Sequence, residues 1–100
     1  METLFCYGTI ADSKIQQKII GRTVDLTKDT LKGFKLSNIT LDDGMFLIVV
    51  RDNTSREVIE GYVLEITSQE LVKFDAYETE AYKRSVVKLE SGTKAWVYHQ

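Results

Sequence analysis

The chain has 100 residues, of which 43% are hydrophobic and 28% are charged. This size and composition are typical of one globular domain over residues 1–100 with a single core, and they exclude a disordered chain. The 13 basic and 15 acidic side chains give a formal net charge of −2. Because no long basic run is present, no nucleic-acid partner is expected.

The rare residue types exclude several further kinds of site. Cys6 and His99 are each the only residue of their type, so neither an intrachain disulfide nor a zinc site of the usual Cys/His kind is predicted. No apolar run approaches the roughly 20 residues of a membrane-spanning helix, so no membrane partner is expected. The N-terminal residues lack the basic segment of a secretory signal. We therefore expect a cytoplasmic protein without a metal site.

The first elements are a strand and a short helix. Residues 4–7 are apolar on both faces and end at Gly8, a pattern that indicates an interior strand covered on both sides. Asp12 or Ser13 is a good N-cap for a helix over 13–20, which Gly21 would end.

The middle of the chain predicts strands and turns. The alternating stretch 22–40 suggests strands interrupted by turns near Lys28-Asp29 and near Gly33. Three further predicted elements are a turn at Asp42-Asp43-Gly44, a strand over 46–50 and a turn at 52–55.

The last part of the chain predicts another strand, a helix and a hairpin. Residues 57–66 read as a strand interrupted by Gly61. The segment Thr67-Ser68-Gln69-Glu70 fits a capping box at the start of a helix over 68–77. Strands over 82–89 and 94–98 would be joined across Ser91-Gly92. This order of strands and helices predicts an α+β fold.

One candidate site is the turn at Gly8 and Thr9, between the first strand and the first helix. Gly8 permits a tight turn and a close approach of a ligand to the main chain. The N–H groups at the start of the next helix would point toward this loop and favour a small anion such as a carboxylate. The alternative is a strand-to-helix turn that binds no ligand.

A second candidate site lies on the helix over 68–77. Leu71, Phe74, Asp75 and Glu78 share one helix face, so the face that enters the core ends in two carboxylates. Desolvation would raise a carboxyl pKa toward the range suited to general acid–base catalysis. Two alternatives are a solvated Glu78 beyond the helix end and a structural ion pair of either carboxylate with Arg84.

Two weaker candidates involve other side chains. Cys6 could act as a nucleophile with His99 as its base, but its place in an apolar strand is typical of a small buried side chain. The five tyrosines could line a pocket or belong to the core.

A set of short motifs resembles the γ-glutamylcyclotransferase-like superfamily, which includes the AIG2-like proteins. The segment from Leu4 to Ile10 is similar to its Y-G-[ST]-L signature, and the segment from Phe74 to Glu78 is similar to its [LF]-D-x-[YF]-E element. Tyr82-Lys83-Arg84 is similar to the Y-x-R that follows. Gly61-Tyr62-Val63 and the segment from Ala95 to Tyr98 resemble two of its strands.

The resemblance implies a small mixed β-barrel flanked by short helices, and an enzyme that needs no cofactor. In active members, a γ-glutamyl amide cyclises to 5-oxoproline and an amine is released. Carried over, Glu78 would be the acid/base, and the substrate-binding residues would be Tyr7, Gly8, Thr9, Ile10 and Tyr82.

The resemblance also implies a small-molecule γ-glutamyl compound as the partner of a monomer or weak dimer. An AIG2-like domain that binds a small molecule or another protein without catalysis is the alternative. Thr79 departs from the family pattern, which commonly has glycine after the glutamate.

Overall fold

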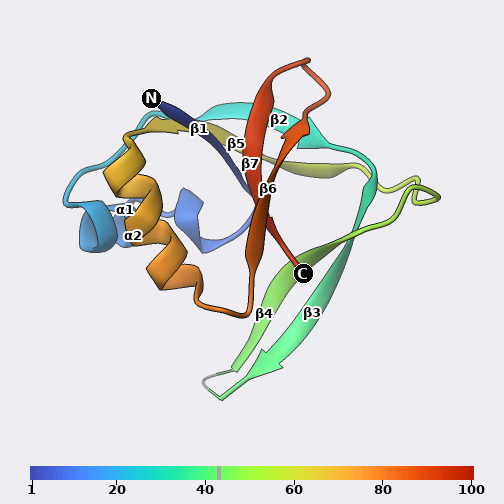
Figure 1. The fold of residues 1–100 in the computed structure, drawn as a ribbon, viewed down its shortest axis with the longest axis horizontal. Helices are drawn as coiled ribbons and strands as arrows, with labels where there is room; N and C mark the ends of the chain where they lie inside the picture. The colour runs from blue at the N-terminus through green and yellow to red at the C-terminus, as the bar shows by residue number, and fades with distance from the viewer. Residues whose placement is uncertain (43) are drawn as a thin grey trace.

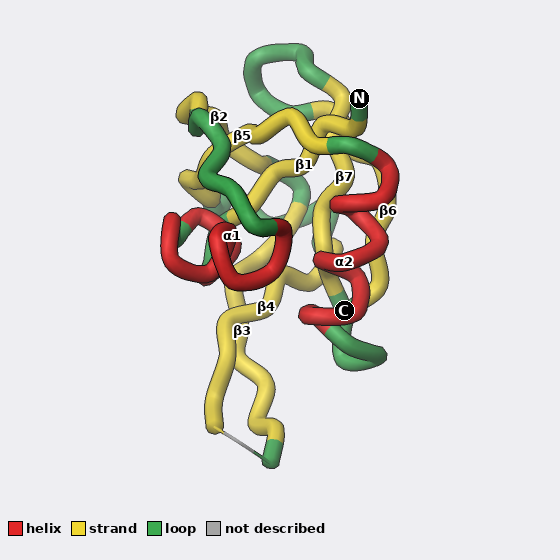
Figure 2. The backbone as a smooth tube through the Cα atoms, turned by 90° about the vertical axis from the view of Figure 1, so that its left-hand side faces the viewer, coloured by secondary structure: helices red, strands yellow, loops and turns green. Residues whose placement is uncertain are grey.

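A computed structural model describes residues 1–42 and 44–100. In it a curled sheet carries both helices on one face, and a two-stranded hairpin projects beyond the sheet (Figures 1 and 2). The elements are β1 (Glu2–Cys6), the 3-10 helix η1 (Thr9–Ala11), α1 (Ser13–Ile20), β2 (Thr27–Leu31), β3 (Phe34–Leu41), β4 (Gly44–Arg51), β5 (Ile59–Ile66), α2 (Ser68–Glu78), β6 (Lys83–Lys88) and β7 (Lys94–His99). The α+β class predicted from the sequence is confirmed.

The strands form two sheets, a five-stranded sheet in the order β2-β5-β1-β7-β6 and the β3-β4 hairpin. The central strand β1 runs antiparallel to β5 and parallel to β7. A backbone hydrogen bond of 3.1 Å from Gln100 N–H to Val49 C=O joins the C-terminal end of the chain to β4. The expected barrel is therefore only approximate, because within the described residues β3 and β4 form a ladder separate from the larger sheet.

The core lies on both faces of β1, as its apolar sequence predicts. Leu4 and Cys6 point to the face that the helices cover, where they join a cluster that includes Leu71 and Phe74 of α2. Phe5 points to the opposite face, into a second cluster closed by residues of β2, β3 and β4. Since successive side chains of a strand alternate between faces, a covered strand must be apolar at every position.

Most of the predicted elements are confirmed, with shifted ends. The expected turn near Lys28-Asp29 is wrong, because both residues lie in β2 and pair with Tyr62 and Gly61 of β5. Strand pairing here outweighs the local turn preference of Asp29. The strand expected over 57–66 begins at Ile59 and continues through Gly61 without interruption. The expected Asp42-Asp43-Gly44 turn includes Asp43, which lies outside the described residues.

Both helices have the predicted ends. Asp12 caps α1 by accepting a hydrogen bond of 2.8 Å from Lys14 N–H, and Gly21 ends it in the left-handed conformation with φ 75°. Thr67 and Glu70 form the predicted capping box of α2. Over residues 1–42 and 44–100, no helix combines the length and the apolar character that crossing a membrane requires.

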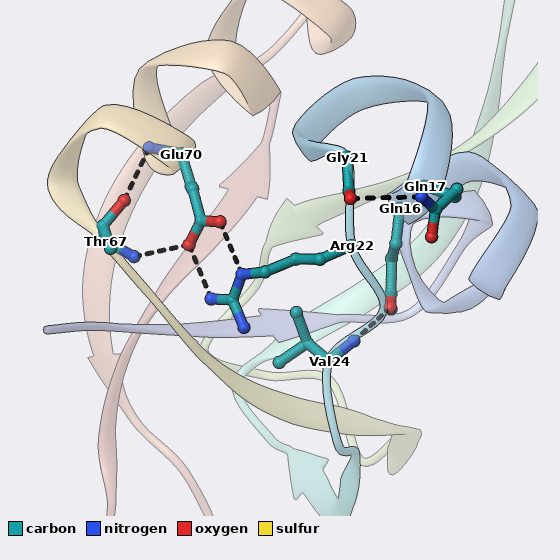
Figure 3. Close-up of polar contacts among 7 residues, drawn as sticks. All are labelled: Gln16, Gln17, Gly21, Arg22, Val24, Thr67 and Glu70. Carbon is teal, nitrogen blue, oxygen red and sulfur yellow. Dashed lines mark hydrogen bonds and ion pairs between the residues drawn. The ribbon is translucent and has the colours of Figure 1, made fainter.

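Glu70 also ties the two helices together (Figure 3). Its carboxylate accepts two hydrogen bonds of 2.7 Å from the guanidinium of Arg22, just beyond the end of α1. The same carboxylate accepts the capping-box hydrogen bond from Thr67 N–H at 2.9 Å. The hydrogen bonds from Arg22 are the main reason that the pKa of Glu70 is lowered from 4.5 to about 2.

We expect Glu70→Ala to destabilise the protein by about 1–2 kcal/mol near neutral pH, because the capping box is lost. The lowered pKa of Glu70 adds stability that is present above pH 4.5 and is lost as the pH falls toward 2. Urea unfolding at several pH values measures both effects. The exposed Glu80→Ala is the control, and an equal loss in both variants would contradict the assigned role.

Candidate active site

A cavity of about 220 Å³ lies between the loop after β1, the C-terminal end of α2 and strand β4. Its volume is below the roughly 300–1,000 Å³ of typical small-molecule pockets, so it suits a small group. All six site residues predicted from the sequence line it. The full lining is Phe5, Cys6, Tyr7, Gly8, Thr9, Ile10, Met45, Phe46, Leu47, Glu78, Tyr82 and Tyr98.

Glu78 is the last residue of α2 and carries the acidic group of the cavity wall. Leu71 and Phe74 on the same helix face are buried, and this anchors the helix so that Glu78 reaches the cavity. Burial raises the pKa of Glu78 from 4.5 to about 7. Among the hydrogen bonds within the described chain, none reaches its carboxylate. This carboxyl is suited to exchanging a proton near neutral pH.

The other described titratable groups that line the cavity are neutral near pH 7. Burial, assisted by the charge of Glu78, raises the pKa of the Cys6 thiol to about 12. Burial also raises the pKa of the phenols of Tyr7, Tyr82 and Tyr98. Among the described residues no cation lines the cavity, and desolvation alone accounts for the shift of the Glu78 pKa.

We expect Glu78→Gln to stabilise the protein near pH 8 and to change its stability little near pH 4. Between pH 4.5 and about 7 the folded state keeps a proton on Glu78 that the unfolded state releases. Stability therefore falls as the pH rises through this window, by about 1–3 kcal/mol. Urea unfolding of the variant and of the exposed control Glu80→Gln measures the difference, and parallel pH profiles of wild type and Glu78→Gln would contradict it.

The loop at Gly8 differs from the sequence prediction. The helix begins at Ser13 as predicted, but its Lys14 N–H already donates a hydrogen bond of 2.8 Å to the Asp12 carboxylate. The 3-10 helix η1 comes first, closed by a 3.2 Å hydrogen bond from Ala11 N–H to Gly8 C=O. The first N–H groups of a short 3-10 helix have no hydrogen-bond acceptor within that helix. The residues of this segment that line the cavity are Gly8, Thr9 and Ile10, which precede α1.

Tyrosine hydroxyls brace the cavity wall. Tyr82 donates a hydrogen bond of 2.7 Å to Leu47 C=O, and Tyr7 donates one of 2.7 Å to Tyr98 C=O. These two rings therefore line the cavity while their hydroxyls hold β4 and β7 in place.

The sequence reasoning missed the wall formed by β4. Met45 and Leu47 line the cavity with 69% and 44% of their surface exposed. The apolar run after Gly44 predicts a strand, but it does not indicate that this strand borders a cavity. Because these side chains are exposed, they leave an apolar rim beside the acidic group.

The two carboxylates of the α2 face have different environments. Asp75 accepts hydrogen bonds from Arg84 at 2.7 and 3.0 Å and from the Tyr98 hydroxyl at 2.7 Å. Burial favours a higher pKa for Asp75, but the hydrogen bonds from Arg84 and Tyr98 outweigh it and lower the pKa. The structural ion pair considered from the sequence thus forms at Asp75, while Glu78 lines the cavity.

Cys6 and His99 have separate surroundings. His99 Nε2 lies 2.8 Å from Ser85 Oγ, and its ring packs edge-on to Phe34. The His99 side chain is not part of the cavity lining. The buried thiol of Cys6, with its raised pKa, does not form a nucleophile–base pair with this histidine.

The chain belongs to the Gamma-glutamyl cyclotransferase, AIG2-like family, whose sequence pattern matches residues 4–100. No curated protein matches the sequence. Similar solved structures include solution structures of two Arabidopsis thaliana proteins, with 24% and 23% identity and TM-scores of 0.80 and 0.78. A structure described as gamma-glutamyl cyclotransferase has 16% identity and a TM-score of 0.78.

These three similarities concern the fold. They cover 98%, 98% and 99% of this chain, but only 67%, 61% and 66% of the respective structures. The chain thus spans about two thirds or less of the length of the proteins that it resembles.

Proposed function

We propose that the protein is a cyclotransferase that converts a γ-glutamyl amide into 5-oxoproline and a free amine. The observation that carries this proposal is the desolvated Glu78 in a cavity that Gly8 and Thr9 also line. Membership of the family supports the same class of reaction.

Glu78 supplies the proton transfers of the proposed reaction. Its carboxylate removes a proton from the substrate's α-ammonium group, and the neutral amine then attacks the γ-carbonyl carbon. A new C–N bond closes the five-membered ring as the original amide C–N bond breaks. Glu78 passes this proton to the departing nitrogen, and the ring nitrogen loses its second proton through Glu78 to solvent as the lactam forms, so the released amine is neutral and the carboxylate is regenerated.

The loop supplies binding and orientation. Gly8, Thr9 and Ile10 line the cavity, and backbone N–H donors at these positions would suit the carboxylate of the glutamyl group or the oxyanion formed during attack. Because nucleophile and electrophile belong to one molecule, the main task of the site is to hold them folded together, and this needs no cofactor.

The test is to incubate the protein with a panel of γ-glutamyl amines, γ-glutamyl amino acids and glutathione, and to measure 5-oxoproline and released amine. We expect equal amounts of both products from at least one compound. Saturable binding without either product would instead favour a binding domain that does not catalyse the reaction.

A further inference from the structure

The position of Glu78 depends on its neighbours in the chain. Its carboxylate accepts none of the hydrogen bonds found within the described chain, and desolvation alone shifts its pKa. A general acid–base must nevertheless lie within hydrogen-bond reach of the proton that it moves. The last turn of α2, which carries Glu78, must therefore be held by other contacts.

One contact holds this turn against the sheet. Asp75, three residues before Glu78, accepts the paired hydrogen bonds of Arg84 in β6 and a hydrogen bond of 2.7 Å from the Tyr98 hydroxyl in β7. The Arg84 guanidinium in turn lies 4.2 Å from the centre of the Trp96 ring. A bidentate pair that also stacks on an aromatic ring has little freedom to rotate.

A second contact holds the last turn of α2 against the loop after β1. The Tyr77 hydroxyl lies 2.7 Å from Thr9 Oγ1, so a hydrogen bond joins the residue beside Glu78 to the loop that lines the cavity. The helix ends immediately afterwards at Thr79, which has φ 64° and ψ −171°, a conformation that favours glycine. Because the backbone at Thr79 is strained, the last turn of α2 depends more strongly on the hydrogen bonds of Asp75 and Tyr77 to stay in place.

We propose that Asp75 and Tyr77 are positioning residues that hold Glu78 in the cavity from two sides, one through the sheet and one through the loop. This inference rests on the proposed function, because it assigns these residues to the reaction that Glu78 would catalyse. It also makes a structural claim that can be measured without turnover.

The experiment compares Tyr77→Phe, Thr9→Val and Asp75→Asn with the wild type. The first two variants remove the same hydrogen bond from opposite ends. Tyr62→Phe is a matched control, because Tyr62 packs against the same apolar cluster from β5. Asp25→Asn, at an exposed position, is the control for Asp75→Asn.

The first measurement is the pKa of Glu78, from the pH dependence of its side-chain carboxyl carbon signal in NMR. We expect the pKa to fall by at least about one unit from 7 toward 4.5 in the three variants, because a looser last turn hydrates the carboxylate. It should not change in Tyr62→Phe or Asp25→Asn. An unchanged Glu78 pKa in the folded variants would overturn the inference, even if their thermal stability fell.

The second measurement is the kinetics of 5-oxoproline formation. We expect Asp75→Asn to lower kcat by roughly 10–100-fold with little change in KM, since a small misplacement of the acid/base affects the transition state. Thr9→Val should also raise KM, because Thr9 borders the glutamyl site. An unchanged kcat in both variants would overturn the positioning role. Wild-type protein without turnover would contradict the proposed function, while the titration would still decide whether the two contacts hold Glu78.

Discussion

Glu78→Gln is expected to lower the rate of 5-oxoproline formation by about 100–10,000-fold, the usual contribution of a general acid–base. Glutamine has nearly the same size and keeps a carbonyl oxygen in the cavity, but it cannot take the proton from the α-ammonium group. The loop donors remain in place, so substrate binding should persist. We therefore expect the loss in kcat, with KM changed by less than about threefold.

The pH dependence of the wild type adds a second check. Since burial raises the pKa of Glu78 to about 7, kcat/KM should fall below that pH as the carboxyl becomes protonated in the free enzyme. Glu80→Gln, two residues along and exposed, is the matched control and should keep wild-type activity. Turnover by Glu78→Gln at more than one tenth of the wild-type rate would rule out the proposed role of this residue.

Elements whose ends carry a strong local signal are predicted well from the sequence. Elements whose conformation depends on pairing with distant strands are predicted less well. The capping box at Thr67 and the glycine stop at Gly21 are confirmed, because both rest on contacts within a few residues. The turn wrongly placed at Lys28-Asp29 lies in a strand, because pairing with β5 determines its conformation. Strand order is likewise non-local, since β1 pairs with β5 and β7, which are distant in sequence.

In the candidate site, too, local features can be predicted from the sequence and features that depend on distant strands cannot. Helical spacing places Asp75 and Glu78 on one face, but it does not determine which of them pairs with Arg84 and which remains unpaired in the cavity. That difference depends on the positions of β6 and β7, which only the folded chain defines. The wall formed by Met45 and Leu47 could not be placed beside Glu78 from the sequence, because it belongs to a separate hairpin.

Gly61→Ala is expected to destabilise the protein by about 1–3 kcal/mol or more, the usual cost of overpacking a core. Gly61 lies within β5, at the position where the sequence predicts an interruption of the strand. A Cβ atom at this position would collide with the backbone oxygen of Cys6 and would lie 2.6 Å from Cζ of Phe5. Because the first obstacle is backbone of the central strand β1, rotation of a side chain cannot relieve the collision.

The matched control adds the same methyl group where there is room. A Cβ at Gly8 meets nothing within 4 Å, so Gly8→Ala should leave the stability within about 1 kcal/mol of wild type. Urea unfolding of both variants measures the difference. Equal stability of the two variants would contradict the assigned role of Gly61. Since Cys6 precedes the loop at Gly8, a displaced β1 should also disturb the cavity, and Gly61→Ala should lose activity under conditions in which it remains folded.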